Sequence, residues 1–301
     1  MKTIIIVALL RCLTFADSNI PAYPKGEIGE MVKLGEDIIK NTSTHPLTKD
    51  LVHNKLNCVS CHLSGPDMHP GNTQTMGTFS GIAAKFPFYN TREGVVITLQ
   101  DRVDNCFMRS MDGTRPIIDS KASIAMAAYI TWLSTGSVID INPATSKAPN
   151  FSADVKKFAK IQKKASHENF KNGGKVFETM CATCHGMDGK GVATFPPLWG
   201  KDSSGKYLSY NTGAGMSKLD KSAAWIQQNM PLGAGGSLSN QEAADVAIYI
   251  NAQDRAPFDL SKKLDDIKDQ GYYNSKRLKE VDNLESNFKK MGLDLKTIRG
   301  K

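Results

Sequence analysis

The sequence predicts an all-α protein made of two similar small domains in tandem. The motif CxxCH occurs twice, at residues 58–62 and 181–185, and the segment IAMAAYITWLSTG of the first half resembles ADVAIYINAQDRA of the second. Tyr129 lies 67 residues after the histidine of the first motif, and Tyr249 lies 64 residues after that of the second. A motif and a closing helix that recur in the same order at similar spacing indicate an internal repeat.

Length and composition agree with this organisation. The chain has 301 residues, of which 40% are hydrophobic and 23% charged, so it can bury two cores. We expect a signal peptide at residues 1–16, an N-terminal domain at 17–136 and a C-terminal domain at 166–256. The linker between the domains, residues 137–165, should be extended at first and then form a solvated helix. The charged tail, residues 257–301, should be a surface helix or partly ordered.

The first residues, MKTIIIVALLRCLTFA, have a basic start, a short apolar run and small residues near Ala16. This order is typical of a secretory signal, and the run is too short to span a bilayer. Arg11 interrupts the pattern, and Cys12 leaves a lipid anchor as the alternative. Either interpretation places the mature chain outside the cytoplasm, where an odd cysteine must be paired, reactive or ligated.

The formal net charge of +8 suits an anionic substrate or an acidic partner, although a merely soluble surface explains it equally well. No segment resembles a nucleic-acid-binding module, so we expect no nucleic acid partner.

The two CxxCH motifs predict two covalently bound haem c groups. Two thiols about one turn apart reach both vinyl groups of one porphyrin, and the adjacent imidazole then lies beneath the iron. A redox-active CxxC pair or a zinc site is the alternative, but a histidine follows the second cysteine both times. The thioether cysteines are Cys58, Cys61, Cys181 and Cys184, and the proximal iron ligands are His62 and His185.

The second motif belongs to a longer pattern, HENFKNGGKVFETMCATCHGMDGKG followed by FPPLWG and EAADVAIYINAQ, which resembles a class I cytochrome c domain. The resemblance implies that a carbonyl of Pro196 or Pro197 accepts a hydrogen bond from His185 and fixes its tautomer.

The distal iron ligands follow from the repeat. In AAWIQQNMPLG, Met230 ends a short helix 45 residues after His185 (230 minus 185), and in the first half Cys106 stands 44 residues after His62 (106 minus 62). We therefore expect Met230 on the second haem and Cys106 on the first. Core packing is the alternative role for both residues. Other candidate ligands are Met187 and Met216 for the second haem, and Met76, Met108, Met111 and His69 for the first.

Cys106 lies in a segment that predicts a helix from about Leu99 to Met111, with Thr98 as its cap and Asp101 completing a capping box. Arg102, Cys106 and Ser110 are spaced by four residues and share one face of this helix. An arginine there can lower the pKa of a thiol and bind an oxyanion, or it can pair with Asp101 or Asp104.

The segments FPFYNTREG and LQDRVDNCFMRSMDG, together with the paired CxxCH motifs, resemble the diheme thiosulfate dehydrogenases, also called tetrathionate synthases. The likeness extends from about Lys33 to Ala256. It implies a catalytic cysteine on the first haem with two arginines and a serine around it, which fall here on Cys106, Arg92, Arg102 and Ser110.

This resemblance implies an oxidoreductase that interconverts two thiosulfates and one tetrathionate plus two electrons, and the signal segment implies that it is periplasmic. A soluble or membrane-associated cytochrome c is the expected electron donor or acceptor. Each haem iron accepts one electron, so two haems match the stoichiometry, and the arginines would neutralise the dianions.

Asn229 stands where some relatives carry a lysine ligand, so a ligand switch is not expected here. The alternatives are a Sox-type sulfur-oxidation haem subunit, a non-catalytic diheme electron-transfer cytochrome c, and a diheme peroxidase.

Overall fold

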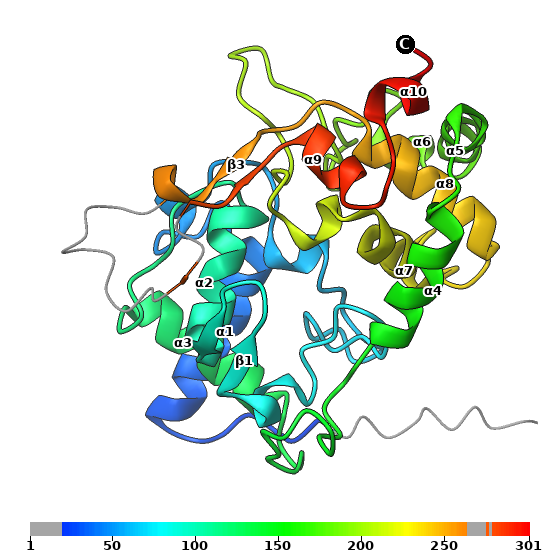
Figure 1. Ribbon diagram of the computed structural model, residues 1–301. Coiled ribbons are helices and arrows are strands. Elements are labelled where there is room, and N and C mark those ends of the chain that lie inside the picture. Colours follow the sequence, from blue (N-terminus) through cyan, green and yellow to red (C-terminus); the bar gives the residue numbers. More distant parts are fainter. Residues whose placement is uncertain (1–19, 264–274, 277–278) are drawn as a thin grey trace, which may run out of the picture.

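The structure is a computed structural model that describes residues 20–263, 275–276 and 279–301, so the predicted signal segment lies outside the described residues. Its longer helices form two groups on opposite sides of Figure 1. The first group contains α1 (Glu27–Asn41), α2 (Leu99–Arg109) and α3 (Lys121–Trp132). The second contains α4 (Ser152–Gln162), α5 (His167–Met180), α6 (Ala182–His185), α7 (Leu219–Asn229) and α8 (Asn240–Asn251).

The all-α prediction is confirmed, because within the described ranges the strands form only two short antiparallel pairs. They are β1 (Phe88–Asn90) with β2 (Val95–Ile97), and β3 (Phe258–Asp259) with β4 (Val281–Asp282). The remaining helices are α9 (Leu284–Lys289), α10 (Leu295–Arg299) and five 3₁₀ segments at Lys49–Leu51, Cys58–Ser60, Ile82–Lys85, Gly215–Ser217 and Leu260–Lys262.

In both groups a glycine lies at a close crossing of two helices, which confirms the internal repeat. A Cβ added at Gly35 of α1 would lie 2.0 Å from the carbonyl oxygen of Ala125 on α3, and one added at Gly173 of α5 would lie 2.1 Å from that of Asp245 on α8. In each case a tyrosine one turn later, Tyr129 or Tyr249, provides the next contact. Only glycine permits so close a crossing of α1 with α3 and of α5 with α8.

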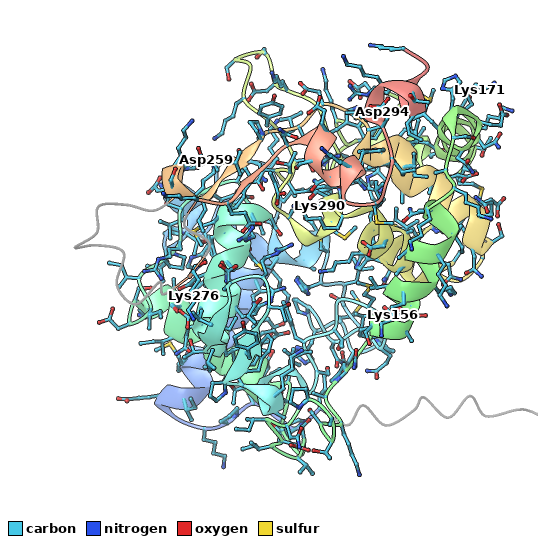
Figure 2. All side chains as sticks on the ribbon, in the orientation of Figure 1. Lys156, Lys171, Asp259, Lys276, Lys290 and Asp294 are labelled. Carbon is cyan, nitrogen blue, oxygen red and sulfur yellow. The ribbon has the colours of Figure 1, made fainter. Side chains whose placement is uncertain are left out.

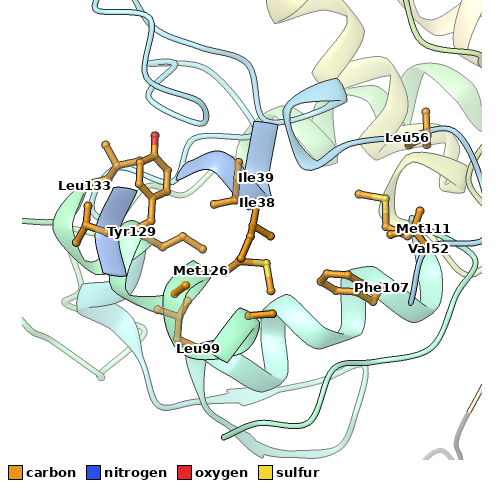
Figure 3. Packing of buried hydrophobic residues seen from close by; sticks show 14 of the residues in the cluster. Ile38, Ile39, Val52, Leu56, Leu99, Phe107, Met111, Met126, Tyr129 and Leu133 are labelled. Atoms are coloured by element: carbon orange, nitrogen blue, oxygen red, sulfur yellow. The ribbon is translucent and has the colours of Figure 1, made fainter. Parts of the chain in front are cut away.

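The first core lies between α1, α2 and α3. Buried side chains from the three helices face one another in Figure 3, among them Ile38, Phe107, Met126 and Tyr129. Burying apolar surface of this kind is the main stabilising contribution to the fold. Because α2 contributes Phe107 to this core, the orientation of the neighbouring Cys106 is set by packing.

Helix α4 of the predicted linker differs from expectation, because one of its faces is packed. Phe158 is fully buried in the core of the second group, and Gln162 donates from Nε2 to the carbonyl oxygens of Leu219 on α7 (3.2 Å) and Ala244 on α8 (3.3 Å). The solvated helix that the lysine-rich composition predicted is therefore found only on the outer face of α4.

The predicted charged tail also differs from expectation. The C-terminal segment, by which we mean the described residues from 257 to 301, crosses over both groups of helices in Figure 1. Phe258 and Leu260 pack on Met108 of α2, whereas Phe288 and Ile298 belong to a core that includes residues of α7 and α8. Figure 2 marks charged residues along this path, namely Asp259, Lys290 and Asp294. The segment is charged overall, but it contains scattered apolar residues that are buried and anchor it.

Replacing Asp245 with asparagine is expected to raise the free energy of unfolding, relative to the wild type, by more at pH 7 than at pH 4. Burial raises the pKa of this α8 carboxyl even though Asn169 and Gln241 donate to it, each at 2.8 Å. The folded state therefore binds this proton more tightly than the unfolded state does. Its contribution to wild-type stability is present below the ordinary carboxyl pKa of about 4 and is lost as pH rises through the raised pKa of the folded state. Urea unfolding at both pH values measures the difference. An equal effect at both would contradict the prediction.

Candidate functional site

The first CxxCH motif is built on the end of α1. Cys58 donates its backbone N–H to the hydroxyl of Thr42 at 3.1 Å, and that hydroxyl lies 3.2 Å from the Cys58 sulfur. Asn57 and Ser60 form a capping box around the 3₁₀ turn that carries the cysteines. Burial raises the pKa of both Cys58 and Cys61 to about 12. These thiols are held as buried neutral groups at one site.

His62 is prepared to bind a metal through a single nitrogen. Its Nδ1 lies 2.6 Å from the carbonyl oxygen of Gly77, and its ring stacks on Phe79 with centroids 4.1 Å apart. Burial lowers the pKa of His62 to about 4, so the imidazole is neutral at pH 7. A carbonyl can only accept, so Nδ1 carries the proton and Nε2 presents its lone pair, as an iron ligand must.

The second motif repeats this arrangement. Cys181 precedes α6, and His185 at the end of that helix has its Nδ1 2.8 Å from the carbonyl oxygen of Pro196. The carbonyl predicted from FPPLWG is thus confirmed. Burial lowers the pKa of His185 and raises that of Cys181 to about 11. Two free thiols and one neutral imidazole with a free Nε2, present at each motif, are the donor set that haem c requires.

Cys106 lies on α2 beside an arginine. The predicted capping box is present, since Thr98 accepts from the Asp101 backbone and Asp101 accepts from that of Thr98, and the helix ends at Arg109. Nη1 of Arg102 donates to the sulfur of Cys106 at 3.1 Å. A guanidinium at this distance stabilises a thiolate. Of the two predicted partners of Arg102, the thiol and a neighbouring aspartate, the structure shows the guanidinium in contact with the thiol.

The charges of Cys106 and Arg102 act on residues of the first CxxCH motif. After burial, the charge on Cys106 is a further cause of the raised pKa of Cys58 and Cys61, and that on Arg102 contributes to the lowered pKa of His62. Electrostatic effects of this kind require proximity. The structure thus brings the lone cysteine, its arginine and the first motif into one site.

The other two predicted residues adjoin this site. Arg92 lies in the β1–β2 loop, and burial together with the charges of Arg109 and Arg102 lowers its pKa to about 10, so it remains cationic at neutral pH. Ser110 follows α2 directly, and its backbone N–H donates to the Cys106 carbonyl at 2.8 Å. The predicted role of the Ser110 hydroxyl is supported by its position on the same helix face as Cys106.

Met230 caps the end of α7 and packs, with Cys181, at the edge of the second core. Its neighbour Asn229 is 6% exposed and connects the two groups of helices. The Asn229 amide donates to the Met76 carbonyl (3.1 Å) and accepts from the hydroxyl of Thr75 (2.6 Å). Since its side chain is bound to residues of the predicted N-terminal domain, Asn229 serves as an interdomain contact.

A second interdomain contact involves Trp225, one turn earlier on α7. Its indole N–H donates to the carbonyl oxygen of Cys61 at 3.0 Å. Gly77, whose carbonyl accepts from His62, lies against the same indole, because a Cβ there would be 3.1 Å from its nitrogen. The first motif and helix α7, which directly precedes Met230, are therefore in direct contact. Sequence spacing gave no signal for this contact.

Replacing Asn229 with alanine is expected to lower the free energy of unfolding by about 2–3 kcal/mol, since it removes buried hydrogen bonds to Thr75, Met76 and the Trp225 carbonyl. Guanidinium unfolding of the haem-loaded protein measures this change. Asn240→Ala, at an exposed position of α8, is the matched control and is expected to change stability by less than about 0.5 kcal/mol. Equal effects of the two substitutions would contradict the interdomain role.

The alternative distal ligands mostly have other environments. Met108 and Met111 are buried in apolar clusters, and Met187 is 64% exposed. His69 contacts Glu36 at 3.3 Å and packs edge-on against Trp132. Met76 and Met216 pack against the second core, as Met230 does. Among the described residues, no cluster of three or more His, Cys, Asp or Glu side chains is arranged to hold a metal ion.

Two family models match the chain, and each covers one motif. The model for the SoxA/TsdA cytochrome c domain matches residues 49–139, and the cytochrome c model matches residues 170–254. Because both describe cytochrome c domains and the donor sets fit, the protein carries two covalently bound haem c groups. The fold is a tandem of two class I cytochrome c-like domains.

Several curated proteins are similar over most of the chain. The thiosulfate dehydrogenase of Stutzerimonas stutzeri (strain A1501) is 34% identical, and the matched region covers 77% of this chain and 70% of that protein. That of Allochromatium vinosum is also 34% identical, covering 80% of this chain and 85% of the relative. That of Thiomonas intermedia (strain K12) is 35% identical, covering 78% and 69%.

A solved structure gives the same result. Thiosulfate dehydrogenase (TsdBA) from Marichromatium purpuratum, in its as-isolated form, superposes with a TM-score of 0.63 at 33% identity. The match covers 77% of this chain and 47% of that one, so this chain spans about half the length of that protein. From the two domain models, the identities and the shared fold, the chain belongs to the thiosulfate dehydrogenase family.

Proposed function

We propose that this protein interconverts two thiosulfates and one tetrathionate with the transfer of two electrons, and that Cys106 is the reacting group. The observation that carries this proposal is the 3.1 Å contact between Arg102 Nη1 and the Cys106 sulfur, next to the first CxxCH motif. A cysteine activated by a guanidinium suits the chemistry of sulfur anions. The family membership supports the same substrate class.

In this proposal His62 and Cys106 ligate the first haem iron, and His185 and Met230 ligate the second. The lone pairs on the two histidines, the contact between Cys106 and Arg102, and the place of Met230 at the edge of the second core support the assignment. Residues 17–136 and 166–256 would be the catalytic and electron-transfer domains. When bound, the haems supply two one-electron acceptors.

The chain's own residues bind and orient the sulfur anions. Arg92 and Arg102 offset the charge of a thiosulfate dianion near Cys106, and the hydroxyl of Ser110 adds a hydrogen-bond donor on the same helix face. The Cys106 thiolate forms a bond to the terminal sulfur of one thiosulfate and gives a cysteine S-thiosulfonate, with the two electrons released to the two one-electron acceptors that the haems would supply. A second thiosulfate attacks that sulfur, releasing tetrathionate and restoring the thiolate. Run backwards, these steps consume two electrons and cleave tetrathionate.

The proposal places the protein in the periplasm, with residues 1–16 as a signal peptide and a soluble or membrane-associated cytochrome c as redox partner. No helix in the described part of the chain is long and apolar enough to cross a membrane.

Steady-state assays of the purified diheme protein test the function. Thiosulfate with ferricyanide measures the oxidative direction, and tetrathionate with a reduced viologen dye measures the reductive one. We expect turnover in both. Absence of turnover in both directions would refute the enzyme proposal and favour an electron-transfer cytochrome. Turnover that requires a sulfur-carrier protein would favour a Sox-type subunit, which the SoxA/TsdA model also covers.

A further inference from the structure

The active-site helix is tied to the β1–β2 loop and to the C-terminal segment through one buried arginine. Arg109, at the end of α2, is 2% exposed, and its Nη2 lies 3.1 Å from Oε1 of Glu93 and 3.1 Å from Oε2 of Glu280. Its guanidinium carbon is 4.3 Å from the ring centre of Phe258. Both carboxylates are largely buried, at 1% and 18% exposure, so this is an interior ion network.

Glu93 directly follows Arg92, the second arginine of the proposed site, in the β1–β2 loop. The carbonyl oxygen of Glu93 accepts from the backbone N–H of Lys276 at 2.9 Å, and a Cβ at Gly94 would lie 3.4 Å from the Lys276 side chain. The loop that carries Arg92 therefore contacts the C-terminal segment through its backbone as well as through the ion network.

Glu280 is itself held in place. Its carbonyl oxygen accepts from the backbone N–H of Leu260 at 3.1 Å, next to the β3–β4 pair. Phe258 and Leu260 pack on Met108 of α2. The carboxylate of Glu280 is thus presented from an anchored segment, and it reaches α2 at a position three residues from Cys106.

The charges of this network suit the arginines beside it. One guanidinium and two carboxylates carry a net charge of −1 near Arg92 and Arg102. The pKa of Arg92 is lowered by burial and by Arg109 and Arg102, whereas Glu280 and Glu93 act in the opposite direction. Without Glu280, the network would be neutral, and the like charges around Arg92 would repel with less compensation.

We propose that Glu280 of the C-terminal segment is a positioning residue, which holds the Arg92 loop against α2 through Arg109 and Glu93. The inference rests on the proposed function for the role of Arg92, but the contact itself is independent of it. Charge-assisted bonds between interior groups impose one geometry, and losing Glu280 removes the contact that ties the Arg109–Glu93 pair to the C-terminal segment. A displaced Arg92 would bind the substrate dianion less well.

The test compares Glu280→Ala and Glu280→Gln with Glu285→Gln, all in the diheme protein. Glu285 is an exposed carboxylate of the same segment, so its substitution makes the same charge change as Glu280→Gln. For Glu280→Ala we expect about a tenfold fall in kcat/KM for thiosulfate, mostly through a higher KM. Amide hydrogen exchange should accelerate in residues 88–97. Glu280→Gln should recover part of both effects, and Glu285→Gln should show neither.

If Glu280→Ala lowers only the melting temperature, with KM and exchange in residues 88–97 unchanged, the bridge is merely stabilising and the inference is wrong. Should the wild type not turn over thiosulfate at all, the proposed function fails, and the exchange measurement still decides whether Glu280 holds the loop. Unchanged exchange would then refute the inference on its own.

Discussion

Replacing Cys106 with alanine is expected to lower the turnover of thiosulfate and of tetrathionate by at least about a thousandfold. In the proposed mechanism the sulfur of Cys106 forms the bond to the substrate, and it is the one cysteine in the described part of the chain that lies outside a CxxCH motif. Helix α2 should persist, because Phe107 and Met108 remain buried. Steady-state rates with ferricyanide and with a reduced dye give the measurement.

Two controls make the Cys106→Ala result specific. Haem content by mass spectrometry should be unchanged, and the absorption and paramagnetic resonance spectra of the first haem should lose their thiolate signature. Val103→Ala, one turn earlier on α2, trims a partly buried apolar side chain and is expected to alter stability alone. Full activity of Cys106→Ala with both haems attached would remove the cysteine from the mechanism.

Arg102→Gln is expected to reduce kcat/KM for thiosulfate by about a hundredfold, which corresponds to about 3 kcal/mol. The substitution removes both the donor to the Cys106 sulfur and a positive charge beside the site. Arg102→Lys should fall in between, because it keeps the charge but loses the planar fork of donors.

The matched control for Arg102 is Lys33→Gln, which removes an exposed cation whose pairing with Glu30 spans one turn of α1. Exposed pairs of this kind contribute little, so kinetics should be unchanged. An equal loss of activity in the two variants would indicate a general effect of net charge. Wild-type activity in Arg102→Gln would contradict the proposed role directly.

Local features of the site could be predicted from the sequence because their determinants are close together in the chain. The capping box at Thr98 and Asp101 and the Pro196 carbonyl that accepts from His185 depend on residues within a few turns of their partners. The all-α tandem followed from the repeated motif. The assignments of Cys106 and Met230 as iron ligands remain predictions from spacing.

Contacts between distant segments could not be predicted. Asn229 and Thr75 are 154 residues apart, and Arg109 and Glu280 are 171 apart, so neither pair leaves a periodic pattern. The lysine-rich composition of the C-terminal segment also concealed its anchors, because a few apolar residues such as Phe258, Phe288 and Ile298 suffice once cores exist to receive them. Composition is an average over all positions of the segment, whereas its packing on the helices depends on a few single residues.

The C-terminal segment also implies an order of maturation. Both CxxCH motifs precede residue 186, whereas the carboxylate that completes the network around Arg109 belongs to residue 280. During synthesis the thiols therefore emerge first, before the segment that closes over α2. We expect haem attachment to come before the Arg92 loop is held in place, so that the substrate site becomes competent only in the finished protein.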